Sequence, residues 1–449
     1  MVLDTRARSS RLADYALTAL ALGLMARRGL ELVDVVASGR WSRRRLSGLA
    51  GRPVEDGGLR VVCVVPMYLE QDIAAETVRF WHRLAQRVNV DQVLFVTTAK
   101  EHSTHGPGTR EIVAAELAAL GDPHRLRLLH CDEVSRFRAA QLNLAVREAR
   151  AGSAAAGGEE VSIWIAVYNA DSRPSDSTFS ELGEEVSVAP HTRVFQQLAA
   201  YVVPERPGTG PVAVGNAILQ TWWTRSHYWA RNTRGRRGRS WWAATTPYST
   251  FGHGEFVRLD FVADIGGFPD FAYADGLLLG WICRLRAEPI GLLASRDDAE
   301  VPRTGRDLIT QQTAWMRGLL NFDATVAWCR EHEQLHLTDA ELVALRAAHL
   351  AIPVAWGFST IAVAAGVTAL LARTAARGPT RGDVARLAGV LAYPLMPALV
   401  LAGTGERPPG LPARLVGVAA SWPLEGLAFW PALVSHVRRT QQAPAKTPR

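Results

Sequence analysis

Short apolar runs alternate with helical stretches between residues 60 and 170, and this alternation limits the chain to a small set of folds. Four runs, at 61–65, 92–97, 126–130 and 162–167, have the length of buried strands. Helical stretches are expected at about 73–86 and 137–149. Strands that alternate with helices form a parallel sheet that is covered by helices on both faces. We therefore expect an α/β domain built on a mostly parallel, Rossmann-like sheet.

Beyond this region we expect a polar loop at about 172–192 and a further strand at 212–219. The stretch 222–242, which comes next, holds six arginines and five tryptophans. This composition suits an anionic membrane surface or a lipid-linked phosphate, a solvated loop, or a nucleic acid. Because apolar anchors follow further along the chain, we expect no nucleic-acid partner.

Three apolar runs follow residue 345, at 349–372, 384–402 and 414–435, and each is near the ~20 residues that cross a bilayer core. The third run contains Pro423 and Glu425, and a carboxylate at bilayer depth costs about 2.5–3.5 kcal/mol. We therefore expect two membrane spans, followed by an interfacial or re-entrant helix.

Charged residues near these runs bear on their orientation. Two spans would return the basic C-terminal tail to the cytosol, as the positive-inside rule prefers. The tail residues are Arg438, Arg439, Lys446 and Arg449. The 373–383 loop, with three arginines, would then lie outside and opposes this arrangement. The prediction is a multi-pass protein of the cell membrane whose main domain faces the cytoplasm.

The N-terminal segment, residues 1–54, is expected to form a helix at 10–38. Arg27 and Arg28 interrupt its apolar face, so we expect this helix to lie in the membrane interface rather than across it. The same arginines follow the apolar stretch 17–25 where a secretory signal would have small residues. The four cysteines lie far apart with no CxxC pair, which suggests reduced thiols rather than a zinc site or disulfides. A net charge of +7 favours anionic partners.

Polar residues follow three of the predicted strands, at 66–70, 97–101 and 169–174. Ligands of open α/β sheets bind at these carboxyl ends. Asn169 and Asp171 place two oxygen-bearing side chains on one side of an extended segment, and such ligands suit Mg²⁺ or Mn²⁺. We assign Asp171 as the metal ligand. The alternative is an ordinary strand-to-turn sequence.

The order of these residues resembles a family, the membrane-bound members of glycosyltransferase family 2 that include cellulose and hyaluronan synthases. The chain reads V-P-M-Y-L-E at 65–70, R-A-A-Q-L-N at 138–143 and N-A-D at 169–171, similar to V-P-x-Y-N-E, A-L-N and D-A-D in the family. The resemblance implies a GT-A fold, a nucleotide-sugar donor, and Mg²⁺ or Mn²⁺ as cofactor. The donor-binding residues that it implies are Pro66, Tyr68, Glu70, Arg138, Asn143 and Asn169.

The resemblance continues on the acceptor side, where the chain reads G-H-G at 252–254, G-G-F at 266–268 and Y-A-D at 273–275. Asp275 stands where the family has the aspartate of T-E-D, which implies a general base and an inverting displacement. Q-Q-T-A-W at 311–315 is similar to Q-x-x-R-W, a motif that covers the donor and contacts the acceptor. The residues assigned to this closing role are Gln311, Gln312, Trp315, Arg317 and His253. For His253, a metal ligand and a turn-supporting residue are the alternatives.

The resemblance thus predicts a membrane-bound hexosyltransferase with a catalytic domain at 55–335 and C-terminal membrane helices at 336–449. Its acceptor would be a membrane lipid, a lipid-linked carrier or a growing polysaccharide. The chain departs from the family at several positions. The segment 97–100 lacks the aspartate that contacts the nucleobase, Asn169 replaces an aspartate, and Ala274 and Ala314 replace a glutamate and an arginine. Two other interpretations stay open: a degenerate member that acts as a membrane scaffold or regulatory binding protein, and a soluble domain whose apolar helices pack on a partner.

Overall fold

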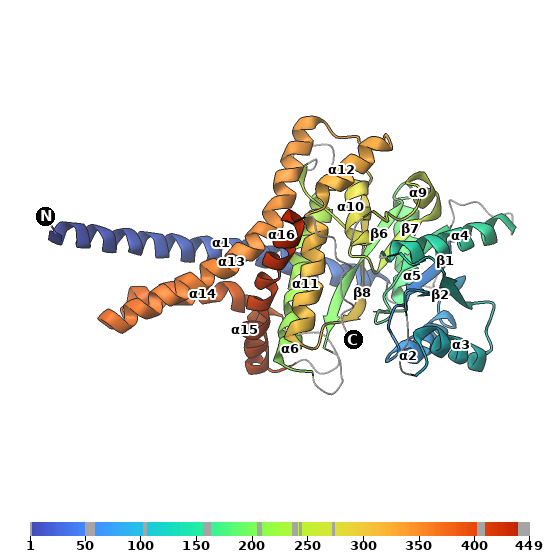
Figure 1. Ribbon diagram of the computed structural model, residues 1–449, viewed down its shortest axis with the longest axis horizontal. Helices are drawn as coiled ribbons and strands as arrows, with labels where there is room; N and C mark the ends of the chain where they lie inside the picture. The colour runs from blue at the N-terminus through green and yellow to red at the C-terminus, as the bar shows by residue number, and fades with distance from the viewer. Residues whose placement is uncertain are drawn as a thin grey trace.

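A computed structural model describes residues 2–49, 59–101, 106–135, 137–155, 163–203, 209–235, 241, 245–271, 274–401 and 409–438. Several residues of the sequence arguments therefore lie outside the described part, namely Arg236, Arg237, Arg239, Trp242, Tyr273, Arg439, Lys446 and Arg449. The described residues form a mixed α/β domain and a set of long helices beside it (Figure 1).

An eight-stranded sheet forms the centre of the α/β domain, with the strand order β3-β2-β1-β4-β7-β6-β8-β5. The strands are β1 (Arg60–Pro66), β2 (Gln92–Thr98), β3 (Leu126–Cys131), β4 (Ile163–Val167), β5 (Arg173–Pro174), β6 (Val194–Val202), β7 (Glu255–Arg258) and β8 (Ile290–Glu300). β1 pairs in parallel with β2 and β4, β2 with β3, and β6 with β8, whereas β7 and β5 pair antiparallel with their neighbours. The expected α/β domain with a mostly parallel sheet is confirmed.

Helices cover both faces of this sheet, which explains why β1, β2 and β4 are buried along nearly their whole length. On one face an apolar layer includes α4 (Ala139–Ala155), α9 (Leu259–Asp264), α10 (Asp275–Leu285) and α12 (Phe322–Glu331). On the other face the layer includes α2 (Ala74–Ala85), α3 (Thr109–Leu120) and α5 (Ser177–Val188). The carboxyl ends of the strands are thus held in fixed positions by a core on each side.

Two sequence-based expectations for the middle of the chain are wrong. The strand expected at 212–219 belongs to the helix α6 (Pro211–Trp223), which begins with Pro211 at a favourable first-turn position. Nearly every residue from 213 to 222 is buried, so the apolar run shows no helical periodicity from which a helix could be predicted. The loop expected at 172–192 contains β5 and the helix α5.

The long helices are α1 (Val2–Leu49), α11 (Gly305–Leu319), α13 (Asp339–Arg377), α14 (Arg381–Val400), α15 (Leu411–Leu427) and the shorter α16 (Phe429–Val437). α1 and the α13–α14 hairpin extend side by side away from the sheet (Figure 1). Asp14 of α1 forms ion pairs with Arg373 at the end of α13 and with Arg386 of α14. Among the described helices, α13 and α14 are long and apolar enough to cross a membrane, by length and composition. The third apolar run forms two helices, α15 and α16.

Helix α15 makes an unusually close contact with α6. A Cβ atom placed on Gly215 of α6 would lie 2.0 Å from the carbonyl oxygen of Gly417 in α15. The backbones therefore touch directly, which only glycine permits. The four cysteines are free and buried, in agreement with the expected reduced thiols.

Candidate active site

A cavity of about 460 Å³ lies at the carboxyl ends of β1, β2 and β4 and continues between α1, α6, α11 and the C-terminal helices. Ten of the residues assigned from the sequence line it: Pro66, Tyr68, Glu70, Arg138, Asn169, Asp171, His253, Asp275, Gln311 and Trp315. Three others, Asn143, Gln312 and Arg317, are not among the lining residues. The structure thus brings together side chains that are up to about 250 positions apart in the sequence.

Arg138, directly before α4, connects three distant segments of this cavity. Its guanidinium donates to Asn169 Oδ1 at 2.7 Å and to Asp275 Oδ2 at 2.7 Å. It also donates to the carbonyl oxygen of Gly252 at 2.6 Å. Charge-assisted bonds of this kind hold planar groups in a fixed orientation. The Asn169 amide oxygen already accepts from Arg138. In the segment 169–171, the side chain that remains as a ligand for a cation is therefore the Asp171 carboxylate.

Asp275 opens α10 and lies next to a buried carboxylate, Glu255. Ala274 precedes it with φ of +66°, a left-handed conformation that is strained for alanine. Glu255 Oε1 accepts from the backbone N–H of Gly252 at 2.6 Å. Burial, together with the negative charge of Asp275, raises the pKa of Glu255 to about 7. Arg138 and Asp275 therefore line the cavity, and the fully buried Glu255 lies beside Asp275 outside the lining.

His253 is oriented by a fully buried carboxylate. Its Nδ1 lies 2.7 Å from Asp297 Oδ2, which also accepts from Ser172 Oγ at 2.9 Å. A carboxylate acceptor at this atom favours the tautomer in which Nδ1 carries the proton. Ser172 directly follows Asp171, so the histidine ring and the Asp171 segment are tied to one side chain.

Asp171 is 3% exposed, and its Oδ2 accepts from the backbone N–H of Glu300 at 3.2 Å. No group of three or more histidine, cysteine, aspartate or glutamate side chains that could hold a metal ion occurs among the described residues. A single carboxylate fits a divalent cation only if other ligands, such as diphosphate oxygens, complete its coordination.

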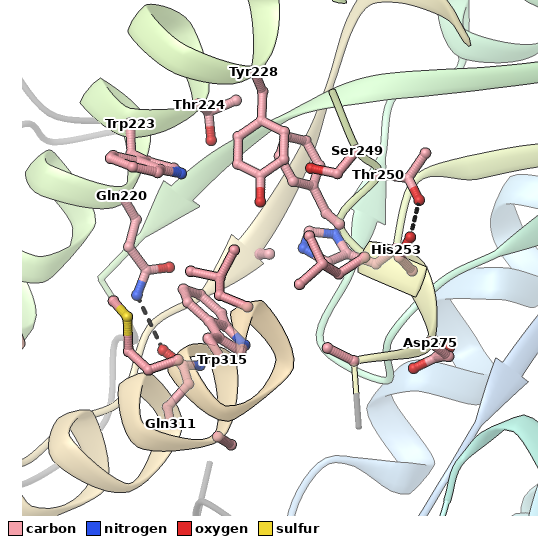
Figure 2. A pocket seen from close by; sticks show the side chains of 18 of the residues that line it. Gln220, Trp223, Thr224, Tyr228, Ser249, Thr250, His253, Asp275, Gln311 and Trp315 are labelled. Atoms are coloured by element: carbon pink, nitrogen blue, oxygen red, sulfur yellow. Dashed lines mark hydrogen bonds between the residues drawn. The ribbon is translucent and has the colours of Figure 1, made fainter. Parts of the chain in front are cut away.

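On the opposite side of the cavity two helices face each other (Figure 2). Gln220 of α6 donates to Gln311 of α11 at 3.0 Å, and Trp315 lies one turn further along α11. α6 continues as a π-helical turn, η2 (Thr224–Tyr228), which directs Thr224 and Tyr228 toward the same space (Figure 2). Such turns occur often at functional sites.

Several lining residues have no place in the sequence-based assignment: Lys100, Gln220, Trp223, His227, Tyr228 and Arg231. Lys100 stands in the segment without the nucleobase aspartate, and its Nζ lies 4.9 Å from the Tyr68 ring. The other five belong to the α6–η2–α7 segment, where α7 is Trp229–Gly235. The high arginine and tryptophan content of this segment was the sequence feature that could have indicated a site. A strand followed by a loop, as expected from the sequence, would not have placed these side chains on one face.

Asn143 has a different role from the one assigned to it. Its side chain donates to the carbonyl oxygen of Phe268 at 3.0 Å and accepts from the Phe268 N–H at 2.7 Å. It therefore fixes the turn at Gly266 and Gly267, both of which have positive φ. The structure places Asn143 between α4 and this turn, outside the cavity lining.

No protein-family model matches the chain, and no curated protein sequence matches it. Among solved structures, a mannosyltransferase from Pyrobaculum calidifontis in complex with GDP-Man and Mn²⁺ superposes with a TM-score of 0.52 at 16% identity, covering 95% of this chain and all of that chain. The chain shares the fold of this glycosyltransferase. Residues 1–349 of TarS from S. aureus give a TM-score of 0.41 at 12% identity, over 85% of this chain and 92% of that one. The first of these structures supports a glycosyltransferase-like fold, and the GT-A class stays a prediction.

Proposed function

We propose that the protein is an inverting, metal-dependent glycosyltransferase, similar to family 2, that moves a sugar, in the first place a hexose, from a nucleotide-sugar donor to a membrane-associated acceptor. One observation carries the proposal: Arg138 joins the Asn169 segment to Asp275 in a single cavity at the strand ends. Donor-side and acceptor-side residues thus meet in one place, in a fold shared with a mannosyltransferase.

The donor would bind where β1, β2 and β4 end. Pro66, Tyr68, Glu70 and Lys100 line this part and are available to the nucleoside. Asp171 would hold a Mg²⁺ or Mn²⁺ ion, which when bound neutralises the negative charge that develops on the departing diphosphate. Asn169 would serve the donor indirectly, because its amide oxygen positions Arg138.

Asp275 would act as the base. Its carboxylate takes the proton of the acceptor hydroxyl while that oxygen forms a bond to the anomeric carbon. The bond from this carbon to the diphosphate oxygen breaks in the same step, and a single displacement inverts the configuration. His253, Gln311 and Trp315 would enclose donor and acceptor. Gln312 and Arg317 would support α11 from outside the cavity.

The test is a transfer assay with the full chain purified in detergent. A panel of nucleotide sugars is supplied with Mn²⁺ or Mg²⁺, and released nucleotide and glycosylated lipid are measured. We expect turnover with one class of donor and its loss when the metal is chelated. A degenerate scaffold protein would show no turnover, and no nucleotide sugar would raise its melting temperature in the presence of metal.

The location proposed for the protein is the cell membrane, with the catalytic domain on the cytoplasmic side. α13 and α14 would be the spans, and the packing of α1 along them favours a place for α1 in the same layer. Recovery of the whole protein in the soluble fraction without detergent would contradict this and favour a soluble domain.

A further inference from the structure

The inner end of the cavity has an excess of positive charge. We call it the inner chamber and define it by Arg28, Glu31, Trp223, His227, Arg231 and Tyr393, all of which line the cavity. It lies between α1, the η2–α7 segment and α14. Arg27 also reaches it, so three arginines face one carboxylate, Glu31.

Glu31 is fully engaged with partners other than Arg231. It pairs with Arg28, accepts from Trp222 Nε1 at 3.0 Å, and lies 3.4 Å from Arg27 Nε. Arg28 in turn donates to the carbonyl oxygen of Tyr393 at 2.7 Å. These contacts fix Arg28 as part of the wall.

Arg231 is different, because no carboxylate among the described residues lies within ion-pair distance of it. Its guanidinium lies 5.6 Å from the centre of the Trp223 ring, and this ring stacks on His227 at 3.8 Å. Burial lowers the pKa of Arg231 to about 10, which leaves the group charged at neutral pH. The pKa of His227 is lowered well below its usual range by burial and by nearby arginines, so its ring is neutral.

The only other carboxylate near this end, among the described residues that line the cavity, is Glu425 of α15. Burial raises its pKa to about 8, so it does not balance the arginines at neutral pH. Three arginines against one carboxylate leave a net positive charge in this partly buried chamber, and a negatively charged ligand would balance it. The chamber therefore has the charge of an anion site.

The walls indicate where the anion comes from. Trp356 of α13, Tyr393 of α14 and Trp422 of α15 line the cavity, and Trp356 packs on Trp223 at 4.6 Å. α13 and α14 are the two helices with the composition of membrane spans, and they expose large apolar side chains such as Phe358 and Ile361. With α13 and α14 as the proposed spans, a ligand that enters the chamber between them would come from the hydrocarbon layer.

We propose that the inner chamber binds the phosphate headgroup of a lipid acceptor through Arg231, with Arg28 and the aromatic rings around it. This inference rests on the proposed function, because it names the acceptor of that same site as a phosphorylated lipid. The headgroup would bind at Arg231, while the hydroxyl or sugar that is to be modified would point toward Asp275.

The test measures binding without donor or metal, by tryptophan fluorescence of the full chain in detergent. The probes are farnesyl phosphate, farnesol and inorganic phosphate. Wild-type protein should bind farnesyl phosphate at least about tenfold more tightly than either of the others. Burial of the farnesyl chain gives the preference over inorganic phosphate, and the charge-assisted pair with Arg231 gives the preference over farnesol. Arg231→Gln should lose this preference, and Arg231→Lys should retain part of it. Arg234→Gln is the matched control, because Arg234 lies on the same helix but pairs with Asp34 outside the cavity.

Equal binding of farnesyl phosphate and farnesol would overturn the proposal, and so would wild-type binding by the Arg231→Gln variant. If inorganic phosphate binds as tightly as the lipid phosphate, the site serves a free anion and the lipid assignment is wrong. The comparison of probes on wild-type protein needs no variant, so it holds even if Arg231→Gln fails to fold. Sugar transfer to a neutral lipid would overturn this inference while leaving the proposed function intact.

Discussion

Asp275 lines the cavity and forms an ion pair with Arg138. Substitution to asparagine removes the negative charge and therefore the ion pair. Asp275→Asn keeps the size of the side chain but removes the proton acceptor. We expect transfer to fall by about 10²- to 10⁴-fold, the range for loss of a general base, with little change in donor binding. Steady-state assays and donor thermal shifts measure the two effects separately.

The control for this change is Asp260→Asn. Asp260 also pairs with an arginine, Arg258, but it is not among the cavity-lining residues, so activity should stay near the wild-type level. Unchanged activity in Asp275→Asn would remove Asp275 from the role of base.

The raised pKa of Glu255 predicts that the free energy of unfolding depends on pH. Its pKa of about 7 in the folded protein lies above the value of 4.5 for the free side chain, so the folded state binds the extra proton between these pH values. This stabilising contribution is complete below pH 4.5 and is lost as pH rises through 7. The charged neighbours are Asp275, which raises the pKa, and Arg138, which lowers it.

Glu255→Gln should therefore reduce the loss of unfolding free energy between pH 5.5 and pH 8 by on the order of 1–3 kcal/mol. Denaturant titrations at the two pH values measure it. Glu116→Gln serves as control, because the pKa of Glu116 is lowered by Arg79 and its titration lies below this window. An equal slope in wild type and Glu255→Gln would show that Glu255 is ionised throughout.

At the scale of helices and strands, the backbones of α6 and α15 lie so close at Gly215 that no side chain fits between them. Gly215→Ala would force the helices apart, at an expected cost of about 1–3 kcal/mol, typical of an overpacked contact. Gly152→Ala in α4 is the matched control, since no atom lies within 4 Å of its added Cβ and helix propensity favours alanine by about 0.5–1 kcal/mol. Melting temperatures in one detergent should therefore move in opposite directions. A stable, fully active Gly215→Ala protein would show that the contact is dispensable.

Some of the helices and strands could be predicted from the sequence, and others could not. β1 to β4 could be predicted, because each is a short apolar run between helical segments, and β1, β2 and β4 are buried on both faces. α6 could not, because burial on all sides removes the periodicity that marks a helix.

Within the site, Arg138 and Asp275 follow from motif order, but the use of the Asn143 amide on a turn depends on distances that no local pattern contains. Arg231 was visible only as composition. The face that it shares with Trp223 and His227 follows from the helical conformation of this segment, because the three residues are four positions apart.

At the scale of the whole molecule, membrane insertion can be tested by chemical labelling, since the four native cysteines are buried and give little background. Ile361→Cys, on α13, replaces a side chain that is 47% exposed, and Val188→Cys, at the end of α5, one that is 75% exposed. In broken membrane vesicles a water-soluble maleimide should label Val188→Cys quickly and Ile361→Cys slowly. Both should react after denaturation in SDS. Equal rates in vesicles would mean that the α13–α14 hairpin is in contact with water.

Both ends of the chain contribute walls to one cavity, since Arg28 belongs to α1 and Trp422 to α15. During synthesis the ribosome releases α1 long before α15. A nascent chain that already contains β1 to β8 and Asp275 still lacks the wall that α15 provides. The enclosed site can therefore form only after α13, α14 and α15 have left the ribosome. Premature termination before residue 411 would then yield a protein that contains every proposed catalytic residue and has an open, incomplete cavity.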